Sequence, residues 1–121
     1  MKIHIVALGI VALASLAAVR AQAPATQAAP VGNAEAGKKL YDSYGCYQCH
    51  GREAQGSSAT GPRLGPKPIA FTAFSQYVRR PTGQMPPYTS KVVSDTEMAD
   101  IYAFVQARPV PAQNVPLLRE P

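Results

Sequence analysis

Apolar side chains recur with helical spacing in three separate segments of the chain. The first segment begins at Asn33, a favoured N-cap residue, and ends at Gly45, because glycine favours the end of a helix. Within it, one helix face with i, i+3, i+4, i+7 spacing is formed by Gly37, Leu40, Tyr41 and Tyr44. Glycine costs a helix about 1 kcal/mol relative to alanine. A glycine on the packing face therefore predicts a second helix that crosses closely there.

The second segment opens with a capping box, Ser94-Asp95-Thr96-Glu97. It predicts a helix that runs to Arg108 and is stopped by Pro109. The apolar face of this helix is formed by Met98, Ile101, Tyr102 and Val105. We expect this helix to cross the first one at Gly37.

The third segment predicts a shorter helix over 69–80, with Phe71, Phe74 and Val78 facing inward. The stretch 51–68 is rich in Gly, Ser and Pro and is expected to be loop. No stretch alternates apolar and polar residues with period two, so no strands are predicted. The sequence therefore predicts one small all-α domain over 33–108.

The N-terminal end of the chain differs in kind from this domain. Lys2 is followed by an uncharged, mostly aliphatic run over 3–19 and by small residues up to Ala21. This is the layout of a secretory signal peptide, so we expect 1–21 to be cleaved and the mature protein to lie in the periplasm, with cleavage after Ala23 as the alternative. The rival interpretation is a retained membrane anchor, because the 17 uncharged residues reach the lower limit of roughly 17 to 25 that spans a bilayer.

Two further segments flank the domain. Residues 22–32 are small and proline-spaced, which predicts a flexible lead-in. Residues 109–121 carry four prolines and predict an extended tail. We interpret this tail as a strap across the domain surface or a disordered end, with docking to a partner as the alternative.

Composition and charge narrow the function. A chain of 121 residues allows one small domain. Its formal net charge of +5 falls to +3 once Lys2 and Arg20 leave with the signal, and no basic run exceeds two residues, so nucleic-acid binding is not expected. From Pro24 onward, Leu, Ile, Val and Phe make up 16 of 98 residues, about 16% against the ~20% below which compact folding becomes doubtful. A large apolar cofactor would complete such a core.

One short motif carries the candidate chemistry. Cys46-Tyr47-Gln48-Cys49-His50 reads C-x-x-C-H, the pattern of covalent c-type haem attachment. One helical turn places the two thiols on the same side, where they can add to the haem vinyl groups while His50 ligates the iron. The alternatives are a Cys46–Cys49 disulfide, a redox dithiol, which would need a βαβ context, and a zinc site, which would need a fourth ligand. The motif occurs once, which predicts one haem c.

The second axial ligand follows by elimination. His4 leaves with the signal, so the mature chain has no second histidine, and the thioether candidates are Met85 and Met98. Met98 lies on the apolar helix face described above, whereas Met85 precedes two prolines in a segment that cannot be helical. We therefore expect His50 and Met85 to be the metal ligands. An empty sixth position remains the alternative.

The order of these features resembles a class I c-type cytochrome over 33–108: a helix, C-x-x-C-H, Thr60-Gly61-Pro62-Arg63-Leu64-Gly65, Met85 and a C-terminal helix. The resemblance implies that Gly37 and Tyr41 meet Ile101 and Phe104. It implies that the Pro62 carbonyl accepts a hydrogen bond from His50, and that Leu64 packs on the haem. It leaves open which residue binds the haem propionates, the candidates being Tyr77, Tyr88, Arg63, Arg79 and Arg80. The chain departs from the family in lacking Trp.

The resemblance implies a function as well as a fold. We expect a one-electron carrier, not an enzyme, that exchanges electrons with redox-partner proteins such as a periplasmic dehydrogenase, a terminal oxidase or a reductase. The membrane would be involved only if the signal is retained as an anchor. The nearest alternative is a dedicated cytochrome c subunit of a periplasmic dehydrogenase. A gas-binding or peroxidatic haem protein, with Met85 displaced, is the alternative from another class.

Overall fold

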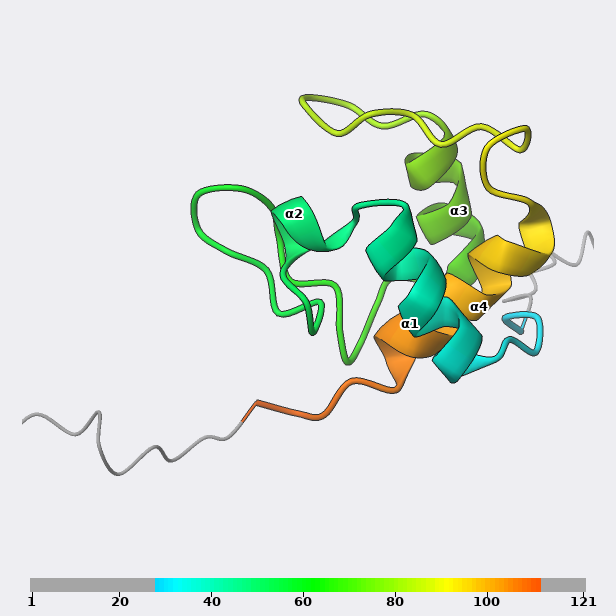
Figure 1. Ribbon diagram of the computed structural model, residues 1–121, viewed down its shortest axis with the longest axis horizontal. Helices are drawn as coiled ribbons and strands as arrows, with labels where there is room; N and C mark the ends of the chain where they lie inside the picture. Colours follow the sequence, from blue (N-terminus) through cyan, green and yellow to red (C-terminus); the bar gives the residue numbers. More distant parts are fainter. Residues whose placement is uncertain (1–27, 112–121) are drawn as a thin grey trace, which may run out of the picture.

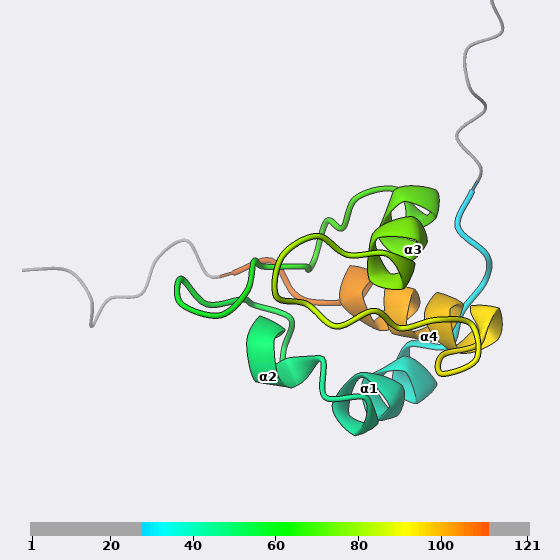
Figure 2. The same cartoon turned by 90° about the horizontal axis from the view of Figure 1, so that it is seen from above.

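The computed structural model describes residues 28–111, which contain four helices and no strand. In chain order they are α1 (Ala34–Ser43), α2 (Tyr47–His50), α3 (Phe71–Arg79) and α4 (Asp95–Gln106). α4 lies between α1 and α3, as Figure 2 shows from above, while α2 and its loop extend to one side (Figure 1). The prediction of an all-α fold is confirmed.

α1 begins where the sequence predicts. The Asn33 side chain accepts hydrogen bonds from the amides of Glu35 and Ala36, each at 2.9 Å. These bonds satisfy two of the amides that lack a partner at a helix N-terminus. The Asn33 amide in turn donates to Asp100 Oδ1 of α4 at 2.7 Å. One residue therefore caps α1 and ties its start to α4.

The crossing of α1 and α4 is as close as the glycine predicts. A Cβ atom on Gly37 would lie 1.9 Å from the Asp100 carbonyl oxygen, so only glycine fits there. One turn further along α1, the ring of Tyr41 packs against that of Phe104 with centroids 5.0 Å apart, and both side chains are fully buried. The contact between these helices that the resemblance implies is confirmed.

The other two predicted helices are present with shorter bounds. The capping box at Ser94 and Glu97 is complete, but α4 ends at Gln106, two residues before the predicted Arg108. α3 spans Phe71–Arg79 rather than 69–80. Residues that precede a proline avoid helical backbone angles, which explains both early C-terminal ends. At the other end of α3, Ala70 is extended, with ψ 142°, and Ile69 is exposed.

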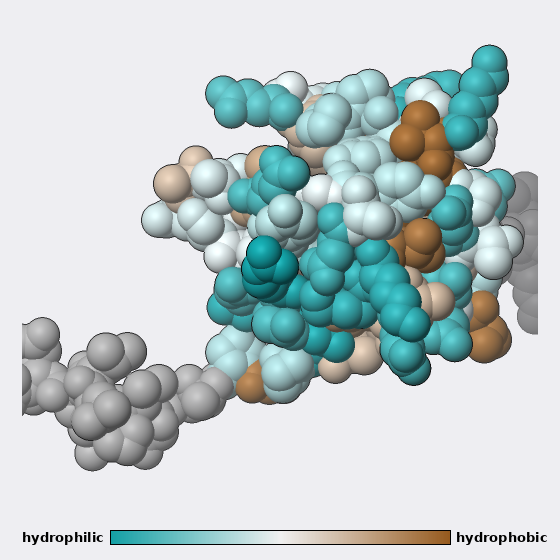
Figure 3. All heavy atoms as spheres, in the orientation of Figure 1, coloured by the Kyte–Doolittle hydropathy of each residue, from teal (hydrophilic) through white to brown (hydrophobic). Residues whose placement is uncertain are grey.

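The core among the described residues is small and lies mainly on α4. It consists of Tyr41, Ala54, Phe74, Val93, Met98, Ile101, Tyr102, Phe104 and Val105. The face over α1 is largely hydrophilic, and its hydrophobic residues form separate spots (Figure 3). None of the helices within 28–111 is both long enough and apolar enough to span a bilayer. The expected signal peptide over 1–21, most of the lead-in and residues 112–121 of the tail lie outside the described residues.

Candidate functional site

The C-x-x-C-H motif forms a single helical turn directly after α1. Gly45, with φ +76°, ends α1 and redirects the chain, and the His50 amide then donates to the Cys46 carbonyl at 3.1 Å. Gly51, also at φ +76°, ends the turn. Both cysteines are free thiols, with Cys46 partly buried and Cys49 exposed. The turn thus offers two unpaired thiols and the imidazole that follows them.

The alternatives to haem attachment find no support in this geometry. Within residues 28–111, no three His, Cys, Asp or Glu side chains converge to hold a metal ion, so a zinc site is not formed there. Burial raises the pKa of the Cys46 thiol to about 11. A redox dithiol needs the opposite, a thiol with a lowered pKa.

The His50 ring is held in one orientation. Its Nδ1 lies 2.8 Å from the Pro62 carbonyl oxygen, and a carbonyl can only accept, so Nδ1–H donates and the bond does not use Nε2. The side chain is 9% exposed. A Cβ on Gly61 would lie 3.1 Å from Nδ1 and 3.0 Å from the Cys49 carbonyl, so the loop packs closely against this edge of the ring. The hydrogen bond that the resemblance implies is present, and it leaves Nε2 as the atom suited to bind a metal.

The loop that supplies Pro62 is fixed to the rest of the domain. Ala54 is fully buried, and its carbonyl accepts from the amides of Leu64 and Gly65 at 2.9 and 3.2 Å. Arg108, just beyond α4, pairs with Glu53 in the same loop. These contacts hold Leu64 partly buried against the core.

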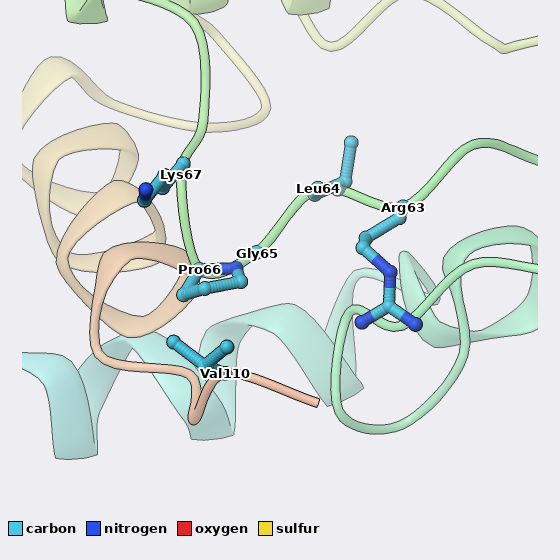
Figure 4. A pocket seen from close by; sticks show the side chains of 6 residues that line it. All are labelled: Arg63, Leu64, Gly65, Pro66, Lys67 and Val110. Carbon is cyan, nitrogen blue, oxygen red and sulfur yellow. The ribbon is translucent and has the colours of Figure 1, made fainter. Parts of the chain in front are cut away.

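A shallow depression lies where the C-terminal end of this loop meets Val110, after α4. It is lined by Arg63, Leu64, Gly65, Pro66, Lys67 and Val110, and the side chains of Arg63 and Leu64 point to opposite sides of the segment (Figure 4). None of Cys46, Cys49, His50 and Met85 lines it. Leu64, which the resemblance places on the haem, is the one predicted site residue that borders this depression.

Met85 lies in a loop between α3 and α4 that has no regular secondary structure. Arg79, at the end of α3, holds this loop, because its Nη1 donates to the carbonyl oxygens of Tyr88, at 2.9 Å, and Val93. The Nη2 of Arg79 also pairs with Asp95 at 2.8 Å. The Arg79 side chain is 18% exposed. It holds the part of the loop that follows Met85, because both carbonyls that it binds lie there.

The two methionines lie in different surroundings. Met98 is 1% exposed within the core of α4, as its helical spacing predicts, whereas Met85 is only partly buried. The structure thus brings Cys46, Cys49, His50 and Pro62 together within residues 44–65, the arm that carries the C-x-x-C-H motif. Met85 lies in a separate loop. The assignment of Met85 as a ligand stays a prediction.

Three of the five residues predicted as candidates to bind the haem propionates make other hydrogen bonds in the structure. The Tyr77 hydroxyl donates to the Thr82 carbonyl at 3.0 Å, the Tyr88 hydroxyl donates to the Tyr44 carbonyl at 2.8 Å, and Arg79 is occupied by the contacts above. Arg63 and Arg80 are exposed. Sequence reasoning missed the structural roles of Arg79 and Tyr88, because their partners are backbone carbonyls that leave no pattern in the sequence.

Comparison with protein families assigns this fold and motif to a class of proteins, the c-type cytochrome domains. A family model described as "Cytochrome C oxidase, cbb3-type, subunit III" matches residues 32–105, and the chain belongs to this family. No curated protein and no solved structure matches the chain significantly. The family implies a haem c cofactor, an iron centre and electron transfer.

The residues present fit this cofactor. The two free thiols stand three positions apart on one helical turn, and His50, whose Nδ1 is engaged by the Pro62 carbonyl, follows them directly. The orientation of His50 by a backbone carbonyl is what a metal-ligating histidine requires, because such a bond fixes the tautomer and raises the basicity of the ligand.

Proposed function

We propose that this protein is a monohaem c-type cytochrome that carries one electron at a time between redox proteins in the periplasm. The observation that carries the proposal is the His50–Pro62 hydrogen bond within the C-x-x-C-H turn. When bound, haem c supplies an iron that alternates between the ferric and ferrous states. Cys46 and Cys49 would hold the haem through thioethers, and His50 would ligate the iron through Nε2.

Met85 is the proposed sixth ligand. Arg79 holds the backbone of its loop at Tyr88 and Val93, so the Met85 thioether would be presented from a held segment of the chain. The Met85 sulfur would favour the ferrous state and raise the reduction potential. With His50 and Met85 both as ligands, no position on the iron would be left for a substrate, and the protein would act as a carrier, not a catalyst.

The optical spectrum of the exported holoprotein tests this ligation. We expect a low-spin spectrum with the near-infrared sulfur-to-iron band, lost in Met85→Ala but kept in Met98→Ala, and no response of the ferrous protein to carbon monoxide. Met98 is the matched control because it is a buried methionine on α4. A high-spin spectrum that carbon monoxide changes would instead indicate an open iron and a sensor or a peroxidase.

The periplasmic location is proposed from the N-terminal sequence. The mass of the mature protein tests it, because cleavage after Ala21 would leave a chain that starts at Gln22. A mature chain that keeps residues 1–21 would support the membrane anchor instead.

The second candidate function is a cytochrome subunit of a larger redox complex. The description of the family names an oxidase subunit, which favours an association with a terminal oxidase; a periplasmic dehydrogenase is the other partner that the resemblance suggests. The tail over 109–121 is the segment proposed for attachment. Truncation after Arg108 should abolish co-purification with such an oxidoreductase, and unchanged co-purification would refute docking through the tail.

A further inference from the structure

The two residues proposed to ligate the iron lie on separate parts of the fold. His50 belongs to the arm over 44–65, and Met85 belongs to the segment over 69–93. Among the residues that the structure describes, one hydrogen bond joins these two segments, from the Tyr88 hydroxyl to the Tyr44 carbonyl oxygen at 2.8 Å. The rings of Tyr44 and Tyr88 also meet edge to face, with centroids 6.3 Å apart.

This bond joins two residues that lie close in the sequence to the residues proposed to bind haem. Tyr44 is the C-cap of α1 and lies two residues before Cys46. Its carbonyl is one of those that a helix C-terminus leaves without a partner inside the helix, and Tyr88 supplies the donor. Tyr88 itself lies three residues after Met85.

Both partners are fixed by further bonds. The Tyr88 amide donates to the Val78 carbonyl at 3.0 Å, and the Tyr88 carbonyl accepts from Arg79. The Tyr44 hydroxyl donates to Glu97 Oε1 of α4 at 2.9 Å. The link between the two segments is thus anchored at α3 on one side and at α4 on the other.

We propose that Tyr88 is a positioning residue that keeps the Met85 loop closed against the arm that carries His50. The inference rests on the proposed His50 and Met85 ligation. An external ligand would reach the iron only after Met85 has moved away, and this movement would break the bond between Tyr88 and Tyr44. Loss of the hydroxyl therefore raises the population of the open loop, and the apparent affinity for an external ligand rises by the same factor.

Titration of the ferric holoprotein with imidazole tests the proposal. Tyr88→Phe keeps the ring and removes the hydroxyl, and we expect it to bind imidazole about tenfold more tightly than the wild type, a change of about 1.4 kcal/mol. Tyr102→Phe is the matched control, because the Tyr102 hydroxyl also donates to a backbone carbonyl, that of Ile69 at 3.0 Å, away from the arm. We expect its affinity to stay within about twofold of the wild type.

The outcomes separate this proposal from the ligation on which it rests. Equal affinities in the wild type and Tyr88→Phe, or an equal rise in Tyr102→Phe, would overturn the role of Tyr88 while leaving Met85 as the ligand. A Met85→Ala holoprotein that keeps the sulfur-to-iron band would overturn the ligand assignment and, with it, the role of Tyr88.

A measurement on the wild type keeps the proposal testable if Tyr88→Phe does not mature. Hydrogen exchange of the ferric protein with and without imidazole reports whether the loop opens on binding. We expect the Tyr88 amide to lose at least tenfold protection while the amides of α4 keep theirs. Unchanged protection of the Tyr88 amide would contradict the proposal.

Discussion

The crossing of α1 and α4 and the loop that carries Met85 are held in different ways. At the crossing, Gly37 lies against the backbone of Asp100, and the buried rings of Tyr41 and Phe104 pack together. The loop contributes one residue, Val93, to the buried core, and its backbone is held by hydrogen bonds, of which Arg79 supplies those to two carbonyls. Packing spreads the stabilisation of the crossing over many small contacts, whereas the loop depends on a few polar groups.

This difference predicts that substitutions at the crossing unfold the whole domain, whereas substitutions in the loop open the loop alone. A change at the crossing lowers the free energy of unfolding of the whole domain, because α1 and α4 form most of its core. A change in the loop opens the loop first, because local opening has its own, smaller free energy. Two probes distinguish these cases in the holoprotein: the sulfur-to-iron band reports the loop, and far-ultraviolet circular dichroism reports the helices.

The largest effect is expected at the crossing, from Gly37→Ala. The new Cβ would overlap the Asp100 carbonyl oxygen at 1.9 Å and force the helices apart, so we expect a loss of at least about 3 kcal/mol in the free energy of unfolding, despite the better helix propensity of alanine. Both probes should shift together in a denaturant titration. Gly83→Ala is the control, because its Cβ meets nothing within 4 Å and its φ of +85° predicts a cost of about 1 kcal/mol. An equal loss in both variants would refute the steric account.

The crossing could be predicted from sequence because its signals are local and periodic. Asn33, the capping box at Ser94 and the spacing around Tyr41 each act within a few residues, so the helices and their contact follow from pattern alone. The C-terminal bounds of α3 and α4 were wrong by one or two residues, because the residue before a proline leaves the helix, and the N-terminal bound of α3 was wrong by two, because Ala70 is extended. The C-x-x-C-H turn was likewise predictable from its spacing.

The loop could not be predicted in the same way. Arg79 bonds to the carbonyls of Tyr88 and Val93, 9 and 14 residues further along the chain. A backbone carbonyl is present at every residue, so no residue type marks these acceptors. Sequence reasoning accordingly left Arg79 and Tyr88 as propionate candidates, whereas the structure uses both to hold the loop.

The next largest effect is expected in the loop, from Arg79→Gln. The shorter, neutral side chain cannot reach all three partners of the guanidinium, and the carbonyls of Tyr88 and Val93 would lose their donor. We expect a loss of about 2 kcal/mol, with the sulfur-to-iron band lost at a lower denaturant concentration than the helical signal. Lys91→Gln, which removes an exposed cation from the same loop, should leave both transitions in place. Coincident transitions in Arg79→Gln would contradict a separately held loop.

A smaller effect is expected from a polar group at the crossing. Asn33→Ala removes the acceptor of two amides of α1 and should cost about 1 kcal/mol in the free energy of unfolding. Because α1 belongs to the crossing, both probes should shift together, as in Gly37→Ala. Ser58→Ala, at an exposed loop position, is the control. A loss of the band before the helical signal in Asn33→Ala would mean that the two regions are not distinct.

The smallest effect concerns Glu97, whose partner Tyr44 accepts the hydrogen bond from Tyr88 in the loop. Hydrogen bonds from the Ser94 amide, the Ser94 hydroxyl and the Tyr44 hydroxyl lower the pKa of Glu97 below its ordinary value of 4.5. A carboxyl whose pKa is lower in the folded state stabilises the fold fully above its ordinary pKa and loses this contribution as the pH falls through the lowered value. The stability difference between the wild type and Glu97→Gln should therefore be constant near neutral pH and shrink below pH 4.5.

Denaturant titrations of the holoprotein at successive pH values measure this difference, with Glu35→Gln as the control at an exposed carboxyl of α1. The remaining carboxyl groups are common to both proteins, so their contributions cancel in the comparison. Because Glu97 anchors Tyr44, which accepts the bond from Tyr88, the sulfur-to-iron band should weaken in the same acidic range before the helices unfold. A difference that persists down to about pH 3 would show that the ionised carboxylate of Glu97 does not stabilise the fold.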